Sequence, residues 1–67
     1  MRKFGALREQ IKNAFGTQKA FANAMGMNLA TLSAKLNGKT VWGLDEIEKA
    51  CQLLDIPASE IIEYFFY

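Results

Sequence analysis

The side chains of this 67-residue chain that could do chemistry are hydrogen-bonding and basic groups rather than catalytic ones. The chain has no histidine, a single cysteine, Cys51, and no pair of carboxylates that the pattern brings to one evident cleft. General acid–base and nucleophilic catalysis depend on such groups, so we expect no enzymatic activity. The same inventory predicts no metal site, no cofactor and no small-molecule ligand.

Basic side chains are concentrated in the first part of the chain, although the net charge of the whole is only +1. Residues 1–39 hold seven lysines and arginines and one glutamate, a net charge of +6, whereas residues 40–67 hold one lysine and six acidic residues, a net charge of −5. A phosphate backbone is bound largely by Lys and Arg, so residues 1–39 suit a nucleic acid. The alternative is that this uneven charge has no function, as in many small proteins.

Apolar residues at helical spacing predict five short helices and no strand. Thr17 and Asn28 are suitable N-caps for the second and third helices, and Gly26 ends the second because glycine adopts a left-handed conformation cheaply. A fourth helix is expected over about 44–54 and a fifth from Pro57 or Ser59 to about 65. The residues expected to face the core are Phe4, Leu7, Ile11, Phe15, Phe21, Ala24, Met25, Leu29, Leu32, Leu36, Leu44, Ile47, Cys51 and Leu54.

The second and third predicted helices, over residues 17–38, form a helix-turn-helix. Two helices that cross steeply must approach closely, which the small residues Ala22 and Gly26 allow while Met25 and Leu32 fill the wedge. Burial of the three leucines of the third helix would turn a small, weakly polar face outward, where it could enter a DNA major groove. This geometry makes Ala30, Thr31 and Ala34 candidate base contacts, and Asn28 or Thr31 could hydrogen-bond a base.

The pattern Gln-x3-Ala-x3-Gly-x5-Leu, which begins at Gln18, resembles the helix-turn-helix domains of the Cro and lambda-type phage repressor family. With the flanking helices the likeness covers nearly the whole chain. It implies a compact, all-α, five-helix, lambda-repressor-like fold in a single domain over residues 1–67. It also implies binding to double-stranded operator DNA as a dimer, with the third helix in the major groove. The positions that match the family's base contacts are Asn28, Leu29, Ala30 and Ala34.

The resemblance further implies which side chains hold the DNA backbone. Gln18 matches a glutamine whose amide, together with the helix N-terminus, holds a phosphate, and Asn37 and Lys39 match the turn that grips the next one. Lys35 occupies a motif position that usually holds a buried aliphatic residue, so its direction stays open. The candidate phosphate contacts are Thr17, Gln18, Lys19, Ser33, Lys35, Asn37, Lys39 and Thr40.

Four aromatic residues in succession end the chain. One helix end can bury about two such rings against its own core, and exposed aromatic rings are typical of partner surfaces. We therefore expect a homodimer, although packing of all four rings within one chain is an alternative. The candidate interface residues are Ile61, Ile62, Tyr64, Phe65, Phe66 and Tyr67.

Two functional hypotheses follow from these patterns. The first is a Cro-like, sequence-specific DNA-binding repressor, and the alternative is a helix-turn-helix scaffold that acts as a protein–protein interaction module, an anti-repressor or co-regulator. No apolar run approaches the roughly 18 to 20 residues that span a bilayer, so we expect no membrane partner. The expected location is the cytoplasm of a bacterial host cell, close to the nucleoid.

Overall fold

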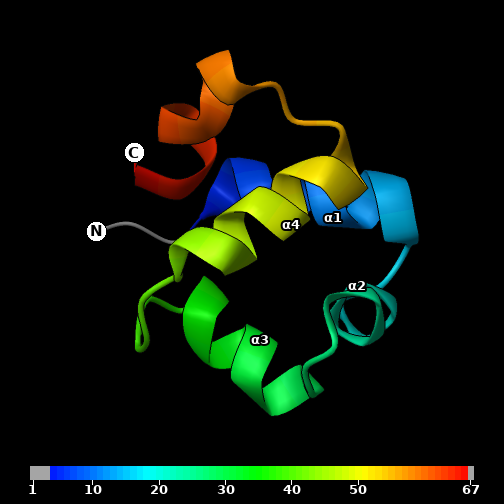
Figure 1. The fold of residues 1–67 in the computed structure, drawn as a ribbon. Coiled ribbons are helices and arrows are strands. Elements are labelled where there is room, and N and C mark those ends of the chain that lie inside the picture. The colour runs from blue at the N-terminus through cyan, green and yellow to red at the C-terminus, as the bar shows by residue number, and fades with distance from the viewer. Residues whose placement is uncertain (1–3, 67) are drawn as a thin grey trace.

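Four α-helices and two short helical turns make up the computed structural model, which describes residues 4–66 (Figure 1). The elements are α1 (Gly5–Phe15), α2 (Gln18–Met25), α3 (Leu29–Leu36), α4 (Leu44–Leu54), a 3-10 turn η1 (Ala58–Glu60) and a π-helical turn η2 (Ile62–Phe66). No strand occurs among residues 4–66, and the predicted compact, all-helical fold is confirmed. None of these helices is long and apolar enough to cross a membrane.

The helix boundaries follow from the capping residues that the sequence predicts. The Thr17 hydroxyl accepts a hydrogen bond from the Ala20 amide at 3.1 Å, and the Asn28 carboxamide oxygen accepts one from the Thr31 amide at 2.8 Å. Gly26 ends α2 with a φ of 77°, in the left-handed region that costs glycine least. The corner between α2 and α3 is therefore fixed by local chemistry on both sides.

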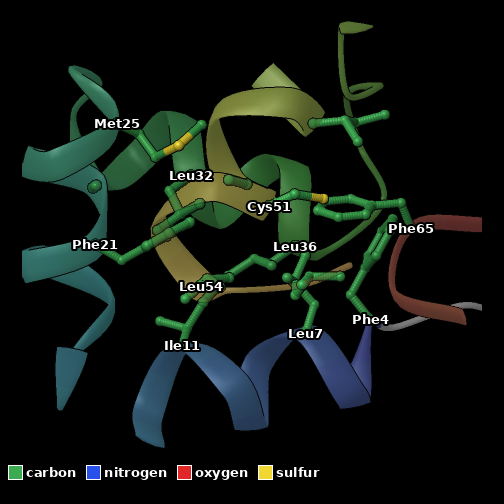
Figure 2. Packing of buried hydrophobic residues seen from close by; sticks show 14 residues of the cluster. Phe4, Leu7, Ile11, Phe21, Met25, Leu32, Leu36, Cys51, Leu54 and Phe65 are labelled. Atoms are coloured by element: carbon green, nitrogen blue, oxygen red, sulfur yellow. The ribbon is translucent and has the colours of Figure 1, made fainter. Parts of the chain in front are cut away.

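The core gathers side chains from every helix (Figure 2). Leu7 and Ile11 of α1 point toward Leu36 and Leu54, while Phe21 enters from α2. Burying one such side chain stabilises the fold by roughly 1.5 to 3 kcal/mol, so this cluster holds the helices together. The chain then returns to its start: the C-terminal segment packs beside α1, and Phe65 lies near Phe4.

Two leucines predicted to be internal lie at the surface instead. Leu29 is 45% exposed and Leu44 is 83% exposed. At about 100° per residue, the buried arc of α3 is centred near Leu32, and that of α4 is centred near Ile47 and Leu54. Each exposed leucine stands in the first turn of its helix, about 70° from the centre of the buried arc, so it lies beside the core rather than in it.

Candidate interaction surfaces

The predicted base-contact residues lie together at the exposed start of α3, a surface that we call the α3 face. Asn28, Leu29, Ala30 and Thr31 are exposed, and Ala34 is half-buried. None of the five carries a charge, and the oxygen of the Asn28 carboxamide already caps α3. The α3 face can make apolar contacts and a few hydrogen bonds to any partner, and its contact with bases stays a prediction.

Most of the predicted phosphate-contact residues lie at the start of α2 or in the loop that follows α3. Thr17, Lys19, Lys39 and Thr40 are exposed, and Gln18 and Ser33 are half-buried. Their contact with phosphates likewise stays a prediction.

Asn37 is exposed, but its side chain takes part in a link between α1 and α3. Its carboxamide oxygen accepts a hydrogen bond from Arg8 Nη2 at 2.8 Å, and the same nitrogen donates to the Leu36 carbonyl at 2.8 Å. This link was not predicted from the sequence, because its partners are 28 and 29 residues apart.

Lys35 does not fit the phosphate contact expected of it, because its side chain turns inward. Only 7% of the residue is exposed. Its Nζ lies 2.8 Å from Glu46 Oε1, donates to the Val41 carbonyl at 3.0 Å and stands 5.9 Å from the centre of the Trp42 ring. With its charge paired inside the fold, Lys35 ties the end of α3 to the following loop and to α4.

Glu46 is the other half of this connection. The hydrogen bond from Lys35 lowers the pKa of the Glu46 carboxyl most, and the hydrogen bond from the Gly43 amide, at 2.8 Å, lowers it further. Both bonds reach the same oxygen, Oε1, so one atom positions the start of α4 and the end of α3. The loop between these helices is therefore held in one place, with Val41 at its exposed tip.

Aromatic rings join this loop to the end of the chain. Trp42 meets Phe4 edge-on at 6.3 Å between ring centres and meets Phe65 at 5.1 Å. Phe65 is only 3% exposed, so it belongs to the core of its own chain, and its predicted place in a dimer interface is wrong. The indole nitrogen of Trp42 is buried and has no hydrogen-bond partner in the part of the chain described.

The remaining residues of the predicted dimer interface divide between the interior and the surface. Ile61 and Tyr64 are half-buried against the core, whereas Ile62 and Phe66 are exposed. Tyr67 lies outside the described residues. The homodimer itself stays a prediction.

A groove of about 670 Å³ runs between α4 and the C-terminal segment. We call it the acidic groove; its lining residues are Leu44, Asp45, Ile47, Glu48, Cys51, Gln52, Ile56, Ala58, Ile61 and Phe66. Burial raises the pKa of the Cys51 thiol, so this side chain is a neutral part of the apolar lining. Phe66 also borders a smaller hollow of about 360 Å³, beside Val41 and Trp42.

The acidic groove was not predicted from the sequence, where the one signal of it is weak. Leu44 falls beside the buried arc of its helix, and Asp45 and Glu48 follow it closely. A single exposed leucine is common on protein surfaces, so this signal was not enough to identify a partner surface.

Comparison with known proteins shows the family to which the chain belongs. The family described as "Protein of unknown function (DUF739)" matches residues 2–67. The chain is similar to the modulator of repression (MOR) of the temperate bacteriophage TP901-1 from Lactococcus lactis, whose solution structure superposes with a TM-score of 0.85 at 42% sequence identity over 96% of this chain and 86% of that chain. No curated protein matches.

These matches correct two expectations from the sequence. The helix-turn-helix pattern suggested the Cro and lambda-type repressor family, but the match is to a modulator-type protein, so that assignment is wrong. The expected function, a Cro-like DNA-binding repressor, is overturned by the same finding, which favours the alternative of a protein-interaction module. The pattern was misleading because it records how α2 and α3 cross, and proteins with different partners can share that crossing.

Proposed function

Because the chain belongs to the DUF739 family of proteins of unknown function and is similar to a phage modulator of repression, we propose that it is a protein-interaction module that modulates repression in a phage. It acts on another regulator rather than as an operator-binding repressor. The similarity to the modulator, at 42% identity over nearly the whole chain, is the observation that carries this proposal.

The described surfaces support a protein partner. Large apolar side chains are exposed at Val41, Leu44, Ile62 and Phe66. Leu44 and Phe66 line one groove, and Val41 and Phe66 line the smaller hollow, and exposed apolar side chains that gather in this way favour protein–protein contact. The charge of Lys35, which the sequence had assigned to a phosphate, is instead paired with Glu46.

The partner that fits is the repressor protein encoded in the same phage genome. A repressor carries its own operator-binding surface, so a small module can change the outcome by binding the repressor. The proposal gives this chain no catalytic activity and places it in the host cytoplasm, where a repressor meets its operator.

Operator titrations with the two proteins test the proposal. A labelled operator duplex is titrated with the repressor alone, with this chain alone, and with the repressor at a fixed excess of this chain, all at one salt concentration. We expect the chain to change the repressor concentration that half-saturates the operator at least about tenfold, which corresponds to about 1.4 kcal/mol. The chain alone should bind the operator no better than it binds a scrambled duplex.

Size-exclusion chromatography of the two proteins without DNA completes this experiment. We expect a complex of the repressor and this chain to elute ahead of either component. Specific binding of the operator by this chain alone, together with an unchanged repressor titration and no complex on the column, would contradict the proposal.

A further inference from the structure

The acidic groove has an apolar lining that no described part of the chain covers. Leu44 and Phe66 line it and are exposed, while Ile47, Cys51 and Ile56 form its deeper part. Exposed apolar area is costly in water, so a partner that covers it gains affinity.

Two acidic side chains of α4 lie along this apolar lining. Asp45 and Glu48 line the groove, and neither makes an ion pair with another of residues 4–66. The acidic groove also belongs to the part of the chain, residues 40–67, whose net charge is −5. Charge complementarity therefore selects an occupant that brings lysines or arginines along with apolar side chains.

The shape of the site restricts how such an occupant binds. A peptide in extended form commonly adds to the edge of a sheet, and residues 4–66 contain no strand that offers an edge. A groove bounded by helices instead accepts an amphipathic helix, whose apolar residues at i, i+3 or i+4, and i+7 enter it.

A second copy of this chain is a poor occupant, although residues 1–39 are basic. Within the described part of that region, Leu29 is the large apolar side chain that is exposed. Its neighbours Asn28, Ala30 and Thr31 carry no charge, so this surface does not combine an apolar stripe with basic residues.

We infer that the acidic groove is the docking site for an amphipathic helix of the partner regulator, with lysines or arginines flanking the apolar stripe of that helix. This inference rests on the proposed function and adds to it the surface used and the chemistry of the segment bound. The α3 face is then not the principal contact.

Paired substitutions separate the two surfaces. Leu44→Ser removes an apolar side chain of the acidic groove and Glu48→Lys reverses a charge there, while Leu29→Ser and Glu9→Lys make matched changes outside it. All four positions are exposed, so the variants should keep the fold, which circular dichroism and thermal melting check.

The affinity of each variant for the repressor of the same genome is measured by calorimetry at two salt concentrations. We expect Leu44→Ser and Glu48→Lys each to raise Kd about tenfold, and the two controls to change it less than about twofold. Wild-type affinity should weaken with added salt, and Glu48→Lys should reduce this dependence, because the attraction is between charges near the surface.

Three results would overturn the inference in different ways. If Leu29→Ser weakens binding and the two groove variants do not, the repressor docks on the α3 face, and the proposed function stands without this site. If the wild-type chain forms no complex with the repressor, the proposed function and the inference both fail. If sedimentation shows that the chain alone self-associates and that Leu44→Ser abolishes the association, the occupant is a second copy.

Discussion

Replacing Lys35 with alanine tests the connection between α3 and α4 most directly. In the wild-type chain the Lys35 ammonium donates to Glu46 Oε1 at 2.8 Å and to the Val41 carbonyl at 3.0 Å. Lys35→Ala removes both bonds and leaves the Glu46 carboxylate without its cation. We expect a clear loss of stability with the helical fold retained.

The size of the loss follows from the exposure of the two partners. A hydrogen bond to a charged group contributes about 1.5 to 3 kcal/mol, and breaking a fully buried ion pair costs about 3 to 5 kcal/mol. The Lys35 side chain is 9% exposed, but that of Glu46 is 34% exposed, so water can partly replace the missing ammonium. We therefore expect the free energy of unfolding to fall by about 2 kcal/mol, which lowers Tm by about 8 to 16 °C in a domain of this size.

Urea denaturation followed by circular dichroism measures this change. Lys39→Ala is the matched control, because it removes the same charge from an exposed side chain and should cost less than about 0.5 kcal/mol. Lys35→Met keeps most of the apolar stem and should cost less than Lys35→Ala. Adding Glu46→Gln to Lys35→Met should recover stability, since glutamine can still accept the bond from the Gly43 amide.

A Lys35→Ala protein as stable as Lys39→Ala would refute this reasoning. It would mean that the lysine contributes no more inside the fold than a solvated surface lysine does. The assigned role of Lys35 as a link between helices would then have to be abandoned.

Two further predictions concern a titrating group and a helix cap. The hydrogen bonds from Lys35 and from the Gly43 amide lower the pKa of Glu46, so the stability that this carboxylate contributes is complete above the ordinary value of 4.5 and is lost as pH falls through the lower folded value. Urea titrations from pH 7 to pH 3 should therefore show that Glu46→Gln loses less stability than wild type. Equal losses of stability would contradict the assignment. Asn28→Ala removes the cap of α3 and should cost about 1 kcal/mol by chemical denaturation, whereas the control Asn23→Ala, on the exposed side of α2, should not destabilise.

Local chemistry made much of the fold predictable. Thr17 and Asn28 cap their helices through their own side chains, and Gly26 adopts the left-handed conformation that the pattern predicts. These features depend on residues within one or two turns, so a single sequence is enough to find them.

Features set by distant partners were not predictable in the same way. The direction of the Lys35 side chain depends on Glu46, eleven positions later. The burial of Phe65 in η2 depends on Trp42, which lies in the loop between α3 and α4. The sequence predicted a fifth helix, but it gave no sign of the 3-10 and π-helical turns that set which of the terminal rings face inward. The acidic groove was missed for the same reason, because it forms only when α4 and the C-terminal segment pack together.

The helix-turn-helix pattern and the proposed docking surface belong to different parts of the molecule, because the pattern lies in α2 and α3 and the acidic groove lies between α4 and the C-terminal segment. Ala22, Met25 and Leu32 are buried where α2 and α3 cross, so they specify the crossing whatever the outer surface meets. The charge pattern was misleading in a related way, because Arg8 and Lys35, which count toward the net charge of +6, bond to other residues of the same chain. A sequence total cannot separate such cations from those that face a partner. The exposed side chains around the acidic groove are therefore better indicators of the partner than the motif that first identifies the fold.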